Sequence, residues 1–566
     1  MATARVGLGC MRLSTDDGGG RQLALETVAA AAGAGVSVFD TARAYGDNER
    51  LLAQALRRCD AEKRARIVTK GGMSRAGGEW MPDGRAKAIV ADCEASLAAL
   101  DGLAIDLYLI HAPDPRTPWR TSVRALARLV EEGLARRVGL SNVNRTQLDE
   151  ALELAPVAAV QIALNVYDDR AVRGGLVERC QQRGIAVIAH SPLGGPRRAG
   201  RLARHRTLAE VADARRATPA EVALAWLLAL SPAVVAIPGA GRPETARSAA
   251  RAAKLELEDE DRAALARAFG APRPARPARP ADDADVVLVM GIPGAGKSRI
   301  AGEYVSRGYV RLNRDERGGS LRELVDALDA ELVSGARRVV LDNTYLTRAS
   351  RSYVVEAASL HRVPARCIWL DTPLAQAQVN LVERLLERLG SLPTPEELRR
   401  AARREPGLLA PTSQMRSLRE LEPPSIDEGF ARVEQVSFTR MPSAGRARVG
   451  VFVAAAALSR PGWERALEQS DRAAPHLVFD WSPGGTLNAL VADLARLSAA
   501  VSGPVESAVC PHPAGPPSCW CRPPLPGLPL AFARAHGVDP ARSILVGAGP
   551  AHHTLATTLG ARYVPV

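Results

Sequence analysis

The 566-residue sequence lacks any long apolar run, since no stretch approaches the ~20 residues that a membrane-spanning helix needs. Its first residues, MATARVGLGCMRLS, contain no basic region followed by an extended apolar core, so we expect no signal peptide. Cysteine is scarce too, with eight residues in the chain. They are scattered or clustered like metal ligands, and they do not form the even pattern of a disulfide framework. These absences predict a cytoplasmic protein without a membrane partner.

Lysine is also scarce: five of the 74 basic residues are Lys, so the other 69 are Arg. The formal net charge of +12 suits a nucleic-acid partner. However, the arginine excess is spread along the chain and equally fits the compositional bias of a GC-rich genome. Charge alone therefore leaves nucleic-acid binding open, whereas a Lys inside a motif is informative because so few can match by chance.

The length predicts several domains, because domains average ~150 residues. The clearest boundary is a stretch of alternating Pro and Arg, residues 271–284, which is typical of an extended linker. A weaker break falls at residues 439–448. We therefore expect three domains of the α/β class, covering residues 1–270, 285–440 and 446–566.

The first segment contains eight short apolar runs, separated by stretches with apolar residues at helical spacing. Strand–helix alternation repeated eight times in roughly 270 residues predicts a (β/α)8, or TIM, barrel. A doubly wound parallel sheet is the alternative, but eight units exceed what that fold needs. In such a barrel, the chemistry lies at the carboxyl ends of the strands.

Four polar side chains fall at these predicted strand ends. Asp40 ends the run VSVFD, Lys70 ends IVTK and His111 ends YLIH, while Tyr45 follows Asp40 by five residues. A buried Lys beside a carboxylate and a Tyr makes a proton donor, in which charged Lys70 is expected to lower the pKa of Tyr45. Each residue alone could be an ordinary loop tyrosine, histidine or ion pair. Together, including one of only five lysines, they predict a catalytic site.

The whole segment resembles the aldo-keto reductase family, which transfers a hydride from NADPH to an aldehyde or ketone. The matching stretches are GLGCMRL, FDTARAYG, IVTKGG, YLIHAPDP, GLSN, VQIALN, HSPLG and IPGAGRPE. The resemblance implies that Tyr45 is the general acid, supported by Asp40, Lys70 and His111. It also implies an NADPH site built from seven residues: Ser141, Asn142, Gln161, His190, Gly239, Ala240 and Arg242.

Two positions differ from the pattern of that family. His190 stands where the family usually has a Tyr that stacks on the nicotinamide. After IPGAGRPE, Ser248 and Ala249 stand where the family commonly has Glu-Asn at the adenine end. The four catalytic positions are complete, so the sequence predicts carbonyl reduction and leaves the cofactor preference open.

The second segment begins with GIPGAGKS, which follows the apolar run DVVLVM and matches the phosphate-binding loop G-x-x-x-x-G-K-[ST]. Backbone amides of such a loop wrap a β-phosphate, Lys neutralises the β/γ oxygens, and Ser binds Mg²⁺. Five residues are expected to hold ATP and Mg²⁺: Gly291, Gly294, Gly296, Lys297 and Ser298. The motif leaves the phosphoryl acceptor open.

Charged residues follow the later predicted strands of this segment. Asp315 comes just after YVRLN, where a carboxylate can take a proton from an acceptor hydroxyl. Asp342 ends RVVLD and precedes a helix. Arg384 and Arg388 are one helical turn apart and could close over the transferring phosphoryl group, the alternative being a solvated helix face.

This segment resembles the kinase module of phage and animal polynucleotide 5′-kinase/3′-phosphatases through the stretches DNT…ASRSYV and EPPSIDEGF. The resemblance implies that Asp315 is the general base toward a 5′-hydroxyl, supported by Asp342, with Lys297 and Arg384 acting on the phosphates. Related P-loop kinases with small-molecule acceptors share the loop and the NRD position, so a metabolite acceptor stays open.

The third segment contains three Cys and one His within twelve residues: Cys510, His512, Cys519 and Cys521. Three thiolates and one imidazole predict a closed, tetrahedral structural Zn²⁺ site, with chance clustering as the alternative. The surrounding sequence resembles haloacid-dehalogenase (HAD) phosphatases with a zinc-stapled loop. As a domain of its own, it would leave kinase turnover mostly intact if the staple were lost.

The catalytic residues of that phosphatase superfamily are missing from the matching positions. Alanines at 454–457 replace its D-x-D nucleophile motif, Pro523 replaces the motif Lys, and Ala548 and His552 replace acidic Mg²⁺ ligands. Without a nucleophile or acidic ligands, aspartyl-phosphate chemistry has no route. We predict a pseudophosphatase; Asp480 as a displaced nucleophile is the alternative.

The leading hypothesis is a multidomain enzyme that combines NADPH-dependent carbonyl reduction with ATP-dependent phosphorylation of 5′-OH polynucleotide ends, as in nucleic-acid end repair. The carbonyl could be a small molecule or an aldehyde on a damaged end. Two alternatives stay open: a reductase and kinase acting on one sugar-like compound, or a kinase flanked by two binding modules. The choice between DNA and RNA, and the oligomeric state, are open.

Overall fold

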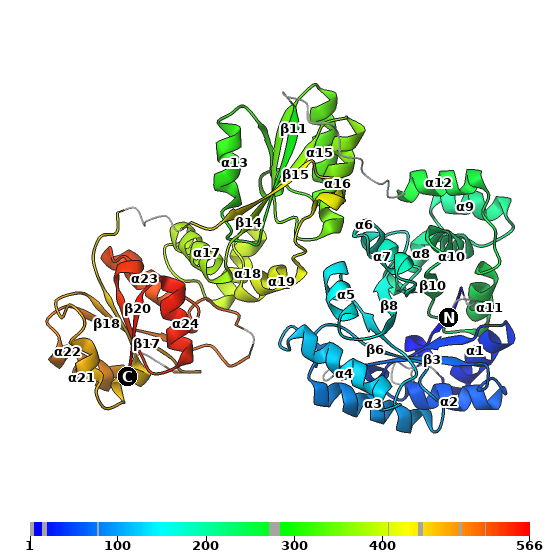
Figure 1. Cartoon of the computed structure of the whole chain (residues 1–566), viewed down its shortest axis with the longest axis horizontal. Helices are drawn as coiled ribbons and strands as arrows, with labels where there is room; N and C mark the ends of the chain where they lie inside the picture. The colour runs from blue at the N-terminus through cyan, green and yellow to red at the C-terminus, as the bar shows by residue number, and fades with distance from the viewer. Residues whose placement is uncertain are drawn as a thin grey trace. The chain divides into compact units, whose positions relative to one another are not determined.

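The structure, a computed structural model, divides the chain into two compact units, Met1–Arg273 and Pro274–Val566 (Figure 1). It describes residues 5–13, 20–75, 79–270, 284–405, 407–439, 445–485, 490–515 and 517–566. The predicted linker therefore lies outside the described residues except for Ala284, and so do residues 440–444 of the weaker break. No helix in the described part is long and apolar enough to cross a membrane.

The first unit contains a (β/α)8 barrel, as predicted. In its described residues, eight parallel strands follow the order β1-β2-β3-β6-β7-β8-β9-β10. Backbone bonds from Gly7 N to Ala236 O (2.8 Å) and from Gly9 N to Pro238 O (3.0 Å) join the first strand to the last. The strands are β1 Leu8–Gly9, β2 Val38–Asp40, β3 Arg66–Gly71, β6 Leu107–Ile110, β7 Val138–Ser141, β8 Val157–Ala163, β9 Ala186–His190 and β10 Val234–Ile237.

Side chains from several strands fill the barrel interior, among them Val68, Leu109 and Ile188. A Cβ at Gly139 would lie 2.4 Å from Ala159 O, so glycine permits the close approach of β7 and β8. The helices described around the strands are α1 Arg21–Gly33, α2 Asn48–Arg58, α3 Ala86–Leu100, α4 Trp119–Glu131, α5 Arg145–Leu152, α6 Arg170–Arg173, α7 Leu176–Gln182, α8 Pro196–Leu202, α9 Arg206–Ala214, α10 Pro219–Leu230, α11 Pro243–Ala252 and α12 Asp259–Phe269. A hairpin of β4 (Met73–Ser74) and β5 (Met81–Pro82) follows β3.

The second unit begins with a parallel sheet in the order β12-β13-β11-β14-β15. Its strands are β11 Asp285–Met290, β12 Val310–Leu312, β13 Arg338–Asp342, β14 Ala365–Asp371 and β15 Arg432–Ser437. The associated helices are α13 Lys297–Val305, α14 Arg314–Arg317, α15 Leu321–Val333, α16 Arg348–Leu360, α17 Leu374–Leu389, α18 Pro395–Arg404 and α19 Pro411–Glu420. The central strand β11 is buried over almost its whole length, which explains its unbroken apolar sequence.

A second parallel sheet of this unit has the order β18-β17-β16-β19-β20. Its strands are β16 Val451–Ala454, β17 His476–Trp481, β18 Val505–Cys510, β19 Ile544–Gly547 and β20 Arg562–Pro565. Its helices are α20 Ala455–Leu458, α21 Trp463–Leu467, α22 Val491–Ala500, α23 Gly527–His536 and α24 Pro550–Leu559. The described residues confirm the predicted α/β class.

The two sheets of the second unit share an apolar cluster. Leu381 and Leu385 of α17 belong to the same buried group as Leu530 and Ala533 of α23. The last 120 residues therefore pack against the helix that follows β14 through this cluster. A second buried cluster, which includes Val451, Val478 and Leu497, lies wholly within them.

Candidate functional site

The four polar residues predicted at strand ends come together in the barrel. Asp40 ends β2, Lys70 lies near the end of β3, and His111 directly follows β6. Tyr45 ends the short 3-10 helix Arg43–Tyr45, which follows β2. All four are at most 9% exposed.

Lys70 is held by two oxygens from the neighbouring strand. Its Nζ donates to Asp40 Oδ1 and to Thr41 O, both at 2.7 Å. Gln161 Nε2 donates to the other Asp40 oxygen at 2.6 Å. Burial alone would lower the pKa of Lys70, but Asp40 and Tyr45 raise it above its ordinary value. The ammonium group therefore stays charged, and its Nζ lies 5.2 Å from the centre of the Tyr45 ring.

The pKa of Tyr45 differs in direction from the expectation. Burial raises the pKa above its ordinary value, and the lowering effect of Lys70 is the smaller of the two. The expected contribution of Lys70 is present, but desolvation exceeds it because the phenol is enclosed. Tyr45 consequently keeps its proton at neutral pH, as a proton donor must.

These residues border a cavity of about 480 Å³. Tyr45, His111 and Trp80 stand edge to face around it, with ring centres 5.7 to 6.1 Å apart. His111 Nδ1 is buried and has no hydrogen-bond partner among the described residues. Burial and the charge of Lys70 lower the pKa of His111 to about 3, so its ring is neutral. Trp80, which precedes β5, is a cavity residue that sequence reasoning missed, because no strand-end or spacing pattern marks it.

The same cavity collects most of the residues expected to bind a nicotinamide cofactor: Ser141, Asn142, Gln161, His190 and Gly239. Asn142 adopts a left-handed backbone conformation (φ 57°), and its Nδ2 donates to His111 O at 3.0 Å. His190 Nε2 lies 3.1 Å from Asn142 Oδ1, and burial together with Lys70 lowers the pKa of His190 to about 4. His190 is therefore a neutral imidazole in the lining of the cavity.

The residues expected at the phosphate and adenine end lie elsewhere. Ala240 is buried and Arg242 is exposed before α11, and the cavity lining includes neither. Ser248 Oγ donates to Glu221 Oε1 at 2.8 Å, and Arg251 pairs with the same carboxylate. Position 248 therefore serves the packing of α11 on α10.

The phosphate-loop motif forms the predicted loop between β11 and α13. Gly291, Gly294 and Gly296 have φ values of 151°, 86° and 95°. A Cβ at Gly294 would lie 2.3 Å from Ala377 O, so this position tolerates no larger residue. Three side chains outside the loop bind its carbonyl groups: Thr372 to Ala295 O (3.0 Å), Asn380 to Gly294 O (2.8 Å) and Gln414 to Pro293 O (3.0 Å).

Three of the charged residues that the sequence singled out act electrostatically on Lys297. Its Nζ donates to Gly291 O and to the next carbonyl, both at 3.0 Å. Burial and Arg384 lower the pKa of Lys297 to about 8, while Asp342 and Asp315 act to raise it. These three side chains are thus close enough to act electrostatically on the loop lysine.

Arg384 and Arg388 do not act as a pair. Arg384 is half-buried, and its charge helps to lower the pKa of Lys297. Arg388 is exposed and lies 3.9 Å from the Glu405 carboxylate. Of the two arginines, only Arg384 therefore has a place at the phosphate loop.

The two aspartates have different surroundings. Asp342 is 2% exposed, and both its oxygens accept from Arg311 at 3.0 and 2.7 Å. Asp315 is 45% exposed and pairs with Arg314 at 3.2 Å. Asp342 is therefore fully held, whereas Asp315 can be reached from solvent. Ser298 is exposed in the first turn of α13.

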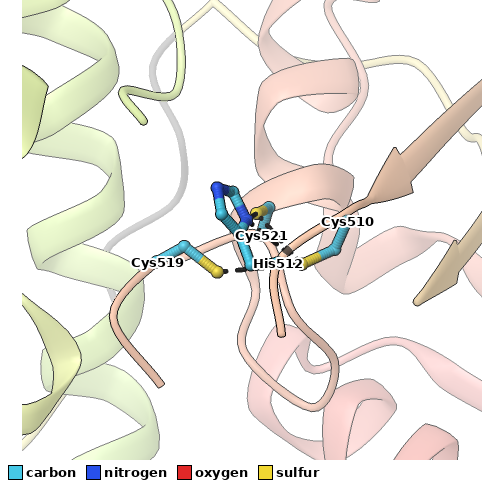
Figure 2. Close-up of side chains that lie close together, drawn as sticks. All are labelled: Cys510, His512, Cys519 and Cys521. Atoms are coloured by element: carbon cyan, nitrogen blue, oxygen red, sulfur yellow. Dashed lines mark hydrogen bonds between the residues drawn. The ribbon is translucent and has the colours of Figure 1, made fainter. Parts of the chain in front are cut away.

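The Cys and His residues of the third segment converge on one point (Figure 2). Cys510 ends β18, and the other three lie in the loop that follows. Their ligand atoms all lie within 4.8 Å of one another, and the Cys510 sulfur is 3.3 Å from that of Cys521 and 3.7 Å from that of Cys519. Zn–S bonds of about 2.3 Å in a tetrahedron place sulfurs about 3.8 Å apart. The donor set and its spacing fit zinc.

The positions that the resemblance in sequence aligns with a phosphatase motif carry no acidic pair. Ala454 ends β16 and Ala455 begins α20, so methyl groups occupy the position of the nucleophile motif. Asp480 is half-buried on β17, and His552 Nδ1 accepts from Ala548 N at 3.2 Å. The carboxyl end of β16 therefore offers no carboxylate that could act as a nucleophile.

Comparison with known proteins finds two family models that match separate parts of the chain. Residues 5–268 match the model described as the aldo/keto reductase family, and residues 286–405 match one described as an AAA domain. An uncharacterized oxidoreductase of Schizosaccharomyces pombe is 32% identical over 269 residues, which are 46% of this chain and 85% of that protein. Aldo-keto reductase str7 of Strobilurus tenacellus is 31% identical over 265 residues, covering 42% of this chain and 78% of its own length.

Among solved structures, an aldo/keto reductase from Klebsiella pneumoniae in complex with NADP and acetate is 29% identical, with a TM-score of 0.41. The match covers 48% of this chain and 92% of that one. The match to the family model, and the identity to proteins that the chain covers over most of their length, agree with the barrel fold. Through residues 5–268, the chain belongs to the aldo-keto reductase family.

Proposed function

We propose that the barrel, assigned to residues 1–270, reduces an aldehyde or ketone with NADPH. The observation that carries this proposal is the buried Asp40–Lys70 pair beside Tyr45 and His111, all at one cavity. NADPH, when bound, supplies the hydride. Tyr45 Oη donates its proton to the carbonyl oxygen, Lys70 stabilises the phenolate that remains, and the neutral His111 ring in the cavity wall donates an N–H to the carbonyl oxygen.

The residues around the cavity fit the nicotinamide end of that cofactor. Gln161 donates through Nε2 to Asp40, which leaves its carbonyl oxygen to accept from the carboxamide. Ser141 and Asn142 offer further polar atoms, and the neutral His190 ring offers a flat face. The carbonyl substrate is a small molecule or an aldehyde on a nucleic-acid end.

We further propose that residues 285–440 form a kinase that transfers the γ-phosphoryl group of Mg²⁺-ATP to a 5′-OH polynucleotide end. The loop amides, Lys297 and Arg384 would bind the phosphates, and Ser298 would bind Mg²⁺. Asp315 would take the proton of the hydroxyl, and Asp342 would hold the site in place through Arg311. The specific support for a polymer is the 45% exposure of Asp315, because an open carboxylate admits a large acceptor.

A labelling experiment tests the acceptor and the general base together. Full-length protein with γ-labelled Mg²⁺-ATP should label the 5′ ends of 5′-OH DNA or RNA oligonucleotides. Asp315→Asn should lower kcat by about 100-fold with little change in KM for ATP, since a positioned base contributes about that factor. Asp326→Asn, an exposed aspartate on α15, is the matched control. Labelling of a sugar-like metabolite with no labelling of oligonucleotides would replace the polymer by the small-molecule alternative.

We propose that residues 446–566 form a HAD-like domain without phosphatase activity. The support is the alanine at the end of β16 and the absence of an acidic residue at 548 or 552. Without a carboxylate nucleophile, no phosphoryl-aspartate can form. Phosphate release from 3′-phosphorylated oligonucleotides that is lost in Asp480→Asn would contradict this assignment.

Zinc in this domain is expected at about one atom per chain, as measured by elemental analysis. Cys519→Ser should remove the metal and lower the Tm of the second unit. It should also lower kinase turnover, in contrast to the independence expected from sequence. The reason is that Trp520, between two of the ligands, is 1% exposed and donates to Leu409 O at 2.8 Å in the kinase segment.

The matched control for this variant is Cys59→Ser in the barrel, a half-buried thiol far along the sequence from the cluster. It should change neither the zinc content nor the kinase rate. A metal-free chain with an unchanged Tm would refute the zinc site, and a zinc-free Cys519→Ser protein with normal kinase turnover would refute the coupling through Trp520.

A further inference from the structure

The second unit contains a cavity of about 680 Å³ next to the phosphate loop. Ala295, Gly296 and Arg299 form one side of it, at the junction of the loop and α13. The loop amides at this junction are those that bind phosphates. Any group attached to a loop-bound phosphate chain can therefore extend into this cavity.

The cavity suits the nucleoside end of a nucleotide in size and in chemistry. Its lining is mixed: apolar side chains, among them Val379, Val436 and Phe438, stand beside polar and charged ones such as Asn380 and Arg534. A nucleoside is mixed in the same way, since its base offers an apolar face and its ribose offers hydroxyl groups that need polar partners. Inorganic phosphate alone would leave most of the volume unused.

The far side of this cavity comes from the C-terminal segment. Leu530 of α23, Leu559 of α24 and residues 539–541 all line it. Ala541 is exposed there, so its methyl group faces the open volume and is not packed in the core. The nucleotide cavity is thus completed by a part of the chain about 240 residues after the loop.

This wall is fixed to the kinase segment by several contacts. Arg446 donates to both oxygens of Glu383 at 2.7 and 2.8 Å, with side chains only 12% and 23% exposed. Gln376 Nε2 donates to Thr558 O at 3.2 Å. The shared apolar cluster of α17 and α23 lies beside these polar contacts. A wall held by a buried core and charge-assisted bonds keeps its position when ligand binds.

We propose that the C-terminal segment serves as one wall of the nucleoside site of the kinase, through Leu530, Leu559 and residues 539–541. A domain without catalytic residues of its own thereby contributes to binding of the nucleoside triphosphate. The proposal rests on the proposed nucleotide-binding function of the phosphate loop. It predicts that the C-terminal segment affects ligands with a base and leaves the triphosphate alone unaffected.

The test is Ala541→Trp in the full-length protein, since an indole at this exposed position fills the cavity without entering the core. Mg²⁺-ATP and Mg²⁺-tripolyphosphate are titrated by calorimetry. The Kd of wild-type protein should be lower for ATP. The variant should raise the Kd for ATP by about 10-fold or more, to the level of tripolyphosphate, and change the Kd for tripolyphosphate by less than about twofold. Ala551→Trp, exposed on α24 and outside the cavity lining, is the control.

Each outcome separates this proposal from the function on which it rests. If wild-type protein binds ATP and Ala541→Trp binds it equally well, with an unchanged Tm, the wall is refuted and the kinase assignment stands. If wild-type protein binds tripolyphosphate as tightly as ATP, the wall is likewise refuted and the kinase assignment likewise stands. If wild-type protein binds neither ligand, the nucleotide-binding function itself fails, and the proposed wall fails with it.

Discussion

Tyr45→Phe is expected to lower kcat for carbonyl reduction by about 1,000-fold, because general acids contribute roughly 100- to 10,000-fold. The substitution removes only the Oη that gives its proton to the carbonyl oxygen. The aromatic ring, its edge-to-face contacts with Trp80 and His111, and the Asp40–Lys70 pair at 2.7 Å all remain. Affinity for NADPH should therefore stay within about twofold, since uniform binding is unaffected when a proton-transfer group is lost. NADPH oxidation with a reactive aldehyde measures the rate, and fluorescence titration measures the binding.

Tyr167→Phe is the matched control, because Tyr167 lies in the same unit but does not line the cavity. It should retain wild-type turnover. Retained turnover in Tyr45→Phe would exclude Tyr45 as the acid. Failure of the wild-type protein to bind NADPH would make the barrel a binding module, and His190→Tyr would then test whether the missing stacking residue is the cause.

The strand-end residues of the barrel were predictable from sequence for a simple physical reason. Strand–helix alternation is a local pattern, and parallel strands of a closed barrel bring their carboxyl ends to one face. Asp40, Lys70 and His111 therefore meet although they are about 70 residues apart. Trp80 was not predictable, since it lies between the two strands of a short hairpin whose position beside the cavity depends on tertiary packing.

The net pKa direction of Tyr45 was not predictable either. Sequence supplies the neighbouring Lys70, whose charge lowers the pKa, but it does not supply the degree of burial that raises it. These two effects oppose each other, so the result depends on how completely the phenol is enclosed. Only the three-dimensional arrangement decides which one is larger.

The contacts between the predicted second and third segments could not be predicted from sequence for a different reason. The apolar positions on α17 and α23 follow helical spacing, which predicts that they are buried but not against which partner. Leu381, Leu385 and Leu530 in fact bury one another. Trp520 likewise sits between two predicted metal ligands, yet its indole reaches Leu409 in the kinase segment. These contacts between the last two predicted segments could not be predicted, because spacing within an element carries no information about contacts between elements.

Lys297→Met is expected to abolish phosphoryl transfer, which means a loss of at least about 1,000-fold in kcat, since one preorganised electrostatic group contributes roughly 100- to 1,000-fold and ATP positioning is lost with it. Lys297 Nζ is anchored to Gly291 O and Ile292 O at 3.0 Å, and Met keeps an apolar stem of similar length without the charge. Transfer of label from γ-labelled ATP measures the effect. Lys254→Met, an exposed lysine of the first unit, should leave transfer unchanged, and NADPH oxidation should be normal in both variants.

The same lysine makes ATP binding depend on pH in a defined direction. Burial and Arg384 lower the pKa of Lys297 to about 8, so below pH 8 the ammonium form already predominates before ATP arrives. Above pH 8 the neutral amine must take up a proton to attract the phosphates, so the affinity falls in proportion to the proton concentration as the pH rises. The Kd for Mg²⁺-ATP should therefore be nearly constant from pH 6.5 to pH 7.5 and rise toward about 10-fold per pH unit above 8. Lys297→Met should bind weakly at every pH and show no such rise. A wild-type Kd that stays flat through pH 9, or a Lys297→Met protein that still transfers phosphate, would remove Lys297 from its proposed role.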